Sequence, residues 1–444
     1  MKARKMAPTP IDLLIDARYI VPVEPFNTTL EHHSVAIRGG RIVDIIPSDQ
    51  ARLQYAASET VSLPEHIVTP GLINLHTHAA MTLMRGLADD LPLMRWLQEA
   101  IWPAETKHVS HAFVRDGSLL AGAEMLRGGI TTCNDMYFFP QASAEAFDRL
   151  GLRAVLGITV IDFPSQYASD ADDYLHKGLA SFESWRDHPL IRFALAPHAP
   201  YTVSNRSFER IGTLAGELEI PIHIHIHETA DEIANSLRDF GQRPIARLES
   251  LGLLGPNLIG VHAVHLDRHD IERLSHHRCA IAHCPISNMK LASGAAPVTQ
   301  LLEHGLSVGL GSDGAASNNR LDLWREMLQA SLLAKLDTGS ASSLPAHQAL
   351  RMATLHGARA LGIDDLTGSL LPGKAADLCA LRIDDPDSLP LFDPVSHLLY
   401  VLGRHCVTDV WVDGQRRVKG GELLQITNTE LLSIARLWQN KLRQ

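Results

Sequence analysis

The chain has 444 residues, of which 45% are hydrophobic and 20% charged, and its formal net charge is −10. This length and composition predict a large globular domain with a smaller module beside it. The negative charge is spread along the chain, which argues against nucleic acid or an anionic membrane surface as a partner.

The cysteines and the N-terminal segment indicate a cytoplasmic protein. The five cysteines are an odd number without Cys-x-x-Cys spacing, which is typical of free, mostly buried thiols in a reducing compartment. The basic N-terminus is interrupted by Pro8, Pro10 and Asp12 before an apolar signal segment could form. No stretch approaches the roughly 18 apolar residues that a membrane span needs.

The first elements in chain order are short strands. Residues 11–48 contain three apolar runs with β character, and Gly39-Gly40 separates the second from the third. Glycine readily adopts the positive φ angles of a tight turn, so this pair predicts a β-hairpin.

Eight β-then-α units follow. Apolar runs of strand length recur, and segments with helical patterning separate them. The runs span 67–78, 131–137, 153–162, 192–200, 220–227, 257–266, 279–288 and 306–314. Buried parallel strands are apolar almost throughout, and eight such units close into a barrel more readily than they form an open sheet. The expected fold class is α/β, a (β/α)8 barrel.

The last elements resemble the first. Residues 376–381 and 407–412 are strand-like, and an Asp413-Gly414 turn follows them. Neither end of the chain could bury a core alone, so we expect both ends to pair into one small, discontinuous β-sandwich. We assign residues 1–66 and 371–444 to this module and residues 67–370 to the barrel.

Functional residues of such barrels lie at the C-terminal ends of the strands. The first run ends in His76-Thr77-His78. Residues two apart on a strand point to the same face, so both imidazoles would enter the barrel mouth together, as ligands of a transition metal do. The alternative is two hydrogen-bonded histidines at the start of a loop, and the short pattern alone does not decide between them.

The fifth run alternates isoleucine with His223, His225 and His227, and Glu228 follows. The isoleucines would face the helices and the histidines the interior, where three unpartnered imidazoles would be costly. We expect His223, the deepest, to be a hydrogen-bonded core histidine. Periodicity does not decide whether His225 or His227 binds a metal.

Two later runs add polar groups. The sixth contains His262 and His265, and the eighth ends in Asp313 between two glycines. A single Ser-Asp-Gly turn is common and mostly structural. Together, however, the paired histidines, a later strand-end histidine and a strand-end aspartate supply four suitable ligands from separate strands, which predicts a metal site.

Longer motifs surround these residues. They read LHTHAAMTLMRGLADDLPLMRWL, HIHET, GVHAVHL, CPISNMKL and GLGSDGAASNNRLDLWREM. As a set they resemble the amidohydrolase superfamily and, within it, the branch of methylthioadenosine and S-adenosylhomocysteine deaminases. The resemblance implies a metal-dependent hydrolase.

The resemblance also implies residue roles. The implied metal ligands are His76, His78, His225 and Asp313. His225 is preferred over His227 because the family's ligand stands three residues before its catalytic glutamate, here Glu228. The implied catalytic residues are Glu228, His262 and Asp313. The implied substrate-binding residues are Glu105, His198, Glu228 and Asp313.

The implied cofactor is one divalent ion per subunit, zinc or alternatively iron. Binuclear relatives carry a carbamylated lysine at the end of the fourth strand, and the fourth run here, RFALAPHAP, contains no lysine. The ion would activate a water molecule that attacks C6 of an adenosine-type nucleoside and releases ammonia.

One departure from the family pattern bears on the substrate. Members that accept S-adenosylhomocysteine hold its carboxylate with arginines on and just after the third strand, but residues 156–161 here include no basic residue. A buried carboxylate without a cationic partner is penalised. We therefore expect a preference for methylthioadenosine, with adenosine as an alternative and S-adenosylhomocysteine disfavoured.

Two other functions compete with this one. The same barrel deaminates free bases and related heterocycles (guanine, cytosine, triazines), for which a ribose-binding Glu105 would have no use. A barrel without activity could serve as a silent scaffold, but all four ligands and Glu228 are present here. We expect a small-molecule substrate and a homo-oligomer.

Overall fold

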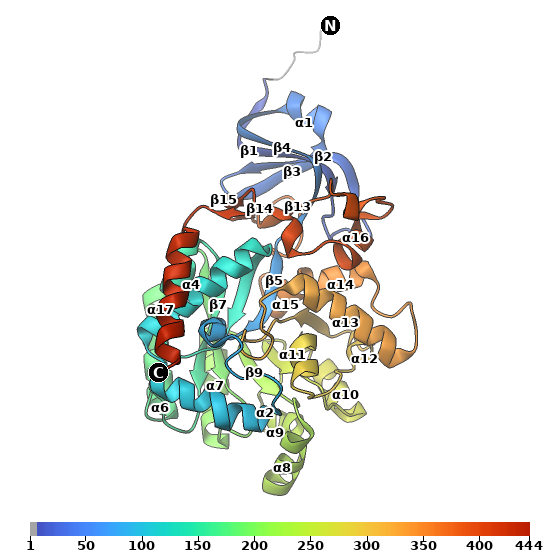
Figure 1. The fold of residues 1–444 in the computed structure, drawn as a ribbon. Helices are drawn as coiled ribbons and strands as arrows, with labels where there is room; N and C mark the ends of the chain where they lie inside the picture. Colours follow the sequence, from blue (N-terminus) through green and yellow to red (C-terminus); the bar gives the residue numbers. More distant parts are fainter. Residues whose placement is uncertain (1–6) are drawn as a thin grey trace.

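The computed structural model describes residues 7–444, so the basic residues that open the chain lie outside the described part. Within it, the strands form two eight-stranded sheets. One sheet, called the barrel sheet, is parallel. The other, called the outer sheet, combines strands from both ends of the chain and lies at one end of the barrel (Figure 1).

The barrel sheet follows the order of the chain, each strand parallel to the next. Its strands are β5 (Leu72–Thr77), β6 (Ile130–Asp135), β7 (Arg153–Val160), β8 (Ile191–Pro197), β9 (Ile222–Ile226), β10 (Leu258–His262), β11 (Ala280–His283) and β12 (Ser307–Leu310). Each strand falls within or overlaps one of the eight predicted runs. The predicted (β/α)8 barrel is therefore confirmed.

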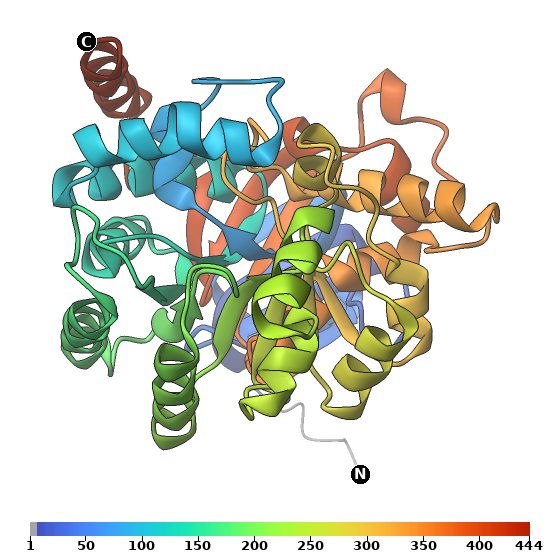
Figure 2. The ribbon, with the colours of Figure 1, turned by 90° about the horizontal axis from the view of Figure 1, so that it is seen from below.

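Helices surround these strands, as the view along the barrel in Figure 2 shows. They are α4 (His111–Arg127), α5 (Pro140–Leu150), α6 (Ala171–Trp185), α7 (Asn205–Leu218), α8 (Ala230–Phe240), α9 (Pro244–Ser250), α10 (Arg268–His276), α11 (Pro285–Lys290), α12 (Val298–Glu303), α13 (Leu323–Thr338), α14 (Ala346–Met352) and α15 (Leu355–Ala360). Side-chain N-caps begin several of them, including Ser110 before α4 and Asp170 before α6. These caps bond otherwise free N–H groups, which fixes where each helix starts.

The barrel closes where its first strand meets its last, and we call this junction the seam. The N–H of Asp313, just after β12, donates to the carbonyl of His76 in β5 at 3.0 Å. Nearby, the side-chain amide of Asn74 makes two hydrogen bonds with Ser312. Its NH2 group donates to the Ser312 hydroxyl at 2.7 Å, and its oxygen accepts from the backbone N–H of Ser312 at 2.9 Å. The seam therefore brings the two ends of the barrel together beside the histidines of β5.

A long connection between β5 and α4 covers one side of the barrel mouth. It contains η1 (Ala79–Met84), α2 (Leu93–Trp96), the π-helical turn η2 (Leu97–Ile101) and α3 (Trp102–His108). Trp96, Leu97 and Ile101 are buried in one apolar cluster with Phe113 of α4. This packing holds the connection against the barrel, where it carries Glu105 towards the site.

The outer sheet is mixed, and strands from the two chain ends pair in it as predicted. Its order is β16 (Glu422–Leu423), β15 (Gln415–Lys419), β14 (Val407–Val412), β13 (Leu378–Arg382), β4 (Tyr55–Pro70), β1 (Thr9–Ile20), β2 (Leu30–Arg38) and β3 (Arg41–Pro47). The predicted hairpin is confirmed: Arg38 pairs with Arg41, and Gly39 and Gly40 between them have φ angles of 57° and 73°. The short helices α1 (Ser48–Gln54), α16 (Pro394–Tyr400), η3 (Pro386–Ser388) and η4 (Arg404–Cys406) connect its strands.

The outer sheet and the barrel are joined covalently and by a buried ion pair. Strand β4 runs through residues 66 and 67 to Pro70, and β5 begins two residues later. At Gly71 between them a Cβ atom would lie 2.1 Å from Thr131 Oγ1, so this close approach requires glycine. Arg153 of β7 donates to both carboxylate oxygens of Asp377, just before β13, at 2.9 and 3.2 Å.

The C-terminal helix α17 (Asn428–Leu442) packs on the barrel helix α4 (Figure 1). Trp438 stacks edge-on against Phe113, with ring centroids 5.1 Å apart, and donates to Asp116 at 2.8 Å. The domain division at residues 66/67 and 370/371 stays a prediction.

Two expectations from composition can be compared with the structure. All five cysteines are free thiols, and four of them are buried, as predicted. In the described part of the chain, no helix combines the length and apolar character required to cross a bilayer.

Candidate active site

Four predicted metal ligands meet at the barrel mouth. His76 lies near the end of β5, His78 directly follows this strand, and His225 lies in β9; one ring nitrogen of each lies within 4.8 Å of the other two. Asp313, just after β12, places Oδ1 3.3 Å from Nε2 of both His76 and His78. The barrel thus brings together groups from the first, fifth and eighth strands.

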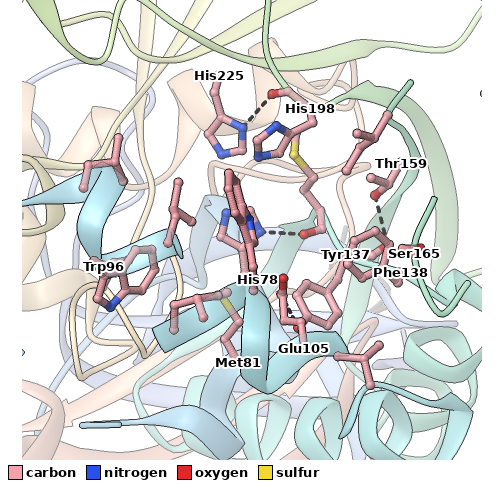
Figure 3. Close-up of a pocket in the computed structure, with 18 of the residues that line it drawn as sticks. His78, Met81, Trp96, Glu105, Tyr137, Phe138, Thr159, Ser165, His198 and His225 are labelled. Carbon is pink, nitrogen blue, oxygen red and sulfur yellow. Dashed lines mark hydrogen bonds between the residues drawn. The ribbon is translucent and has the colours of Figure 1, made fainter. Parts of the chain in front are cut away.

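Hydrogen bonds orient the imidazoles (Figure 3). His78 Nδ1 lies 2.6 Å from the carbonyl of Met136, and His225 Nδ1 lies 2.7 Å from the carbonyl of His198. A carbonyl only accepts, so both Nδ1 atoms carry hydrogen and both Nε2 atoms keep a lone pair for a ligand. His76 Nδ1 lies 3.0 Å from Nε2 of His223, which confirms His223 as a buried, hydrogen-bonded core histidine.

The donor set fits a divalent transition metal. His76 Nε2 is buried and, among the described residues, has no hydrogen-bond partner, although it faces Asp313. Burial lowers the pKa of His76 to about 3 and that of His225 well below its ordinary value, so both imidazoles are neutral. Neutral imidazoles and a carboxylate are the ligands that zinc binds in four-coordinate sites.

His227 points away from this cluster. Its Nε2 accepts from the N–H of Ile245 at 3.1 Å, and its Nδ1 lies 3.1 Å from the carbonyl of His265. Both ring nitrogens are therefore used in packing β9 against its neighbours. Of the two histidines between which periodicity did not decide, only His225 faces His76 and His78.

Glu228 and His262 form a buried pair beside the histidine cluster. The two side chains approach to 3.8 Å. Burial raises the pKa of Glu228 above its ordinary value, and the charge of Asp313 raises it further. Burial lowers the pKa of His262, but the charges of Glu228 and Asp313 outweigh this, and the pKa lies above its ordinary value. The pair can hold and exchange a proton.

Small polar side chains form hydrogen bonds that orient His262 and the neighbouring carboxylate of Asp313. His262 Nδ1 lies 2.8 Å from Asn288 Oδ1, an acceptor, so Nδ1 carries hydrogen and Nε2 faces Glu228. Ser287 donates to Asp313 Oδ2 at 2.6 Å, and Ser317 donates to the same oxygen at 2.8 Å. Ser317 is not among the predicted site residues, because its place in the loop after β12 gives no periodic signal in the sequence.

Glu105 reaches the cavity from α3. Its carboxylate accepts from the hydroxyl of Tyr137 at 2.7 Å, and in Figure 3 this pair lies on the side of His78 opposite His225. Burial raises the pKa of Glu105 to about 7, and the bond from Tyr137 opposes this rise. Tyr137 is not among the predicted site residues, although it is the last residue of the predicted run 131–137.

His198, which follows β8, also lines the cavity. The hydroxyl of Thr202 donates to the carbonyl of Ala199 at 3.1 Å, so it accepts from His198 Nδ1 at 3.0 Å. This leaves His198 Nε2 as an acceptor. Burial lowers the pKa of His198 to about 4, which keeps the imidazole neutral.

Nine of the side chains described above line one cavity of about 340 Å³: His78, Glu105, Tyr137, His198, His225, Glu228, His262, Asp313 and Ser317. This volume lies in the range of about 300–1,000 Å³ that is usual for small-molecule sites. Trp96, Leu97, Ile101 and Phe163 form part of its apolar wall. Within residues 7–444 no lysine or arginine lines it, and its charged groups are the carboxylates of Glu105, Glu228 and Asp313 and the imidazoles. The cavity suits a neutral, flat, polar-edged ligand.

Comparison with known proteins identifies the family. The amidohydrolase family matches residues 67–417. A protein of Teredinibacter turnerae, named 5-methylthioadenosine/S-adenosylhomocysteine deaminase, is 45% identical over 434 residues, which cover 98% of each chain.

Two solved structures are also similar. An adenosine deaminase from Xanthomonas campestris with bound zinc is 46% identical, covers 98% of this chain and 100% of its own, and superposes with a TM-score of 0.97. Atrazine chlorohydrolase from Arthrobacter aurescens, complexed with zinc, is 25% identical over 96% of this chain and 99% of its own, with a TM-score of 0.89. Sequence, fold and comparisons agree that the chain belongs to the amidohydrolase family, whose members are metal-dependent hydrolases.

Proposed function

We propose that the chain is a hydrolytic deaminase that replaces the C6 amino group of an adenosine-type nucleoside by oxygen, with 5′-methylthioadenosine as the preferred substrate. One observation carries the proposal: three imidazoles and Asp313 lie beside the buried Glu228–His262 pair at the end of one cavity. The names of the relatives and of the Xanthomonas structure support this reaction.

The proposed metal ligands are His76, His78, His225 and Asp313. We propose zinc, because its preferred donors match this set and because a similar structure contains it. A bound divalent ion supplies the Lewis acidity that makes a water molecule nucleophilic near neutral pH.

The proposed proton transfers use the side chains around this site. Glu228, whose pKa is raised by burial, donates a proton to N1 of the purine, so that the ring accepts electrons as water adds to C6. Asp313, with His262 beside it, takes one proton from the attacking water and passes it towards the departing amino group. The C6–N bond then breaks as the hydroxyl on C6 gives its remaining proton to Glu228, which regains its acid form. The products are the inosine analogue and ammonia.

Other groups of the cavity would bind the nucleoside. Glu105, aligned by Tyr137, has one carboxylate oxygen that can accept from ribose hydroxyls. His198, with a free Nε2 lone pair, can accept a hydrogen bond from the substrate. A free base offers nothing for Glu105 to bind, so this residue favours a nucleoside over guanine, cytosine or a triazine.

The composition of the wall supports the preference for methylthioadenosine. After β7 the cavity is lined by Phe163, Pro164, Ser165 and Gln166, which carry no charge. A methylthio group is apolar and suits such a wall. The amino-acid carboxylate of S-adenosylhomocysteine would enter it without a cationic partner, which is unfavourable.

A spectrophotometric deamination screen tests the proposal. The purified, zinc-loaded protein is offered adenosine, methylthioadenosine, S-adenosylhomocysteine, guanine and cytosine, and kcat/KM is compared. We expect turnover of the nucleosides, fastest for methylthioadenosine. Equal kcat/KM for methylthioadenosine and S-adenosylhomocysteine would refute the substrate preference, and turnover of free bases alone would refute the nucleoside assignment. A cytoplasmic location and a homo-oligomeric assembly complete the proposal.

A further inference from the structure

Glu232 is a buried carboxylate of α8 that has no part in the chemistry proposed above. It is 5% exposed and lies one turn beyond Glu228. Within the described chain, no lysine, arginine or histidine forms an ion pair with it; its hydrogen-bond partners are two backbone amides. A buried carboxylate is retained only where its hydrogen bonds offset the loss of water. Its partners therefore indicate its role.

Those partners are the two residues that turn the chain from β9 into α8. Glu232 Oε1 accepts from the N–H of His227 at 2.9 Å, and Oε2 accepts from the N–H of Glu228 at 2.9 Å. His227 has a φ angle of 55°, the left-handed region that non-glycine residues rarely occupy. Each oxygen of Glu232 thus holds one peptide of a strained turn, and this turn sets the direction of the Glu228 side chain.

This arrangement differs from ordinary helix capping. Thr229 is the N-cap of α8 and accepts from the N–H of Glu232. In a capping box the third helical residue bonds back to the N–H of the N-cap itself, as Asp270 does with Asp267 at the start of α10. Glu232 occupies the same helical position but bonds the two amides before the N-cap. Its hydrogen bonds therefore stabilise the turn that carries Glu228, in place of the N-cap of the helix.

We propose that Glu232 is a positioning residue: its bidentate grip on the amides of His227 and Glu228 aims the Glu228 carboxyl into the cavity, towards His262. The proposal rests on the role given above to Glu228. A misplaced proton donor slows the chemical step more than it weakens substrate binding. Loss of these two hydrogen bonds therefore lowers kcat and leaves KM and metal content nearly unchanged.

Two substitutions separate positioning from helix capping. Glu232→Gln keeps the shape of the side chain but turns one acceptor into an NH2 group that faces an N–H. Glu232→Asp keeps the charge and, as Asp270 shows in α10, suffices for a capping box, but it is one methylene too short to hold both amides. Asp231→Asn is the matched control, because Asp231 is an exposed acid of the same helical turn.

The zinc-loaded proteins are compared by steady-state kinetics, metal content, thermal melting and hydrogen exchange of peptides covering residues 222–232. For both Glu232 variants we expect kcat to fall about 10- to 100-fold, KM and metal content to stay near wild type, and exchange to accelerate in these peptides alone. Asp231→Asn should match the wild type.

Full activity of Glu232→Asp, or a kcat of Glu232→Gln within about twofold of wild type, would overturn the proposal. So would loss of metal together with faster exchange throughout the barrel, which would assign Glu232 to the stability of the fold. If the wild type turns over no nucleoside, the proposed function fails, while unchanged exchange at residues 227–228 in the variants still refutes the grip itself.

Discussion

Because Tyr137 donates a hydrogen bond to Glu105, we expect Tyr137→Phe to lower kcat/KM through a higher KM. The bond is 2.7 Å long, and Tyr137 is buried while Glu105 is half-buried against the cavity. A hydrogen bond to a charged group contributes about 1.5–3 kcal/mol, and partial exposure favours the lower value. About 1.5 kcal/mol corresponds to a loss of about tenfold in kcat/KM. Glu105 is proposed to bind the ribose, away from the reacting ring, so the loss should fall on KM and spare kcat.

The pH dependence gives this prediction a second readout. Burial raises the pKa of Glu105 to about 7, and the Tyr137 hydroxyl opposes the rise. The ionised carboxylate is the better acceptor for ribose hydroxyls, so KM should fall as pH rises through this pKa. Without the hydroxyl the pKa rises further, so the midpoint of the KM profile should move to higher pH in Tyr137→Phe.

The assay is the deamination of methylthioadenosine followed at several pH values for wild type and variant. Tyr174→Phe is the matched control, because Tyr174 is a buried tyrosine of α6 whose hydroxyl does not bond Glu105. A kcat/KM within about twofold of wild type, or a tenfold loss that lies in kcat, would refute the reasoning.

Three further predictions concern the site and the fold. Glu228→Gln should keep the metal and lower kcat by about 10²- to 10⁴-fold, the usual contribution of a proton donor; retained activity in a metal-replete variant would contradict its role. Removal of the metal by a chelator should abolish deamination and lower Tm, and added zinc should restore both; activity that survives complete metal loss would exclude the metal-dependent mechanism. Arg153→Met should destabilise the chain by about 3–5 kcal/mol in urea unfolding, because it leaves the carboxylate of Asp377 buried without its partner. Arg149→Met, which breaks the exposed pair with Glu430, should cost about 0–1 kcal/mol, and equal losses in the two variants would refute this comparison.

The features that could be predicted from the sequence are those that repeat. All eight barrel strands lie in the predicted runs or overlap them, because a buried parallel strand must be apolar along its length, whatever its neighbours. The Gly39-Gly40 hairpin was predictable because its positive φ angles demand such residues. His76 and His78 share a face because alternation along a strand is a local property.

The features that could not be predicted depend on loop conformation. The direction of His227, away from the histidine cluster, follows from a left-handed φ just after β9 that no periodicity encodes. The contact of Tyr137 with Glu105 needs the path of a 33-residue connection between β5 and α4, from residue 78 to residue 110. The docking of α17 on α4 likewise depends on which barrel surface is left uncovered, and an amphipathic pattern does not specify that surface.

The seam of the barrel has a consequence for how the protein matures. Asn74 and Ser312, which hold the seam closed, are 238 residues apart in sequence; the proposed ligand His76 lies two residues after Asn74, and Asp313 directly follows Ser312. A ribosome must therefore synthesise the chain as far as residue 313 before all four proposed ligands exist. The complete metal site therefore forms only when the barrel closes, and an ion bound there would link the first strand of the barrel to the segment after the last strand.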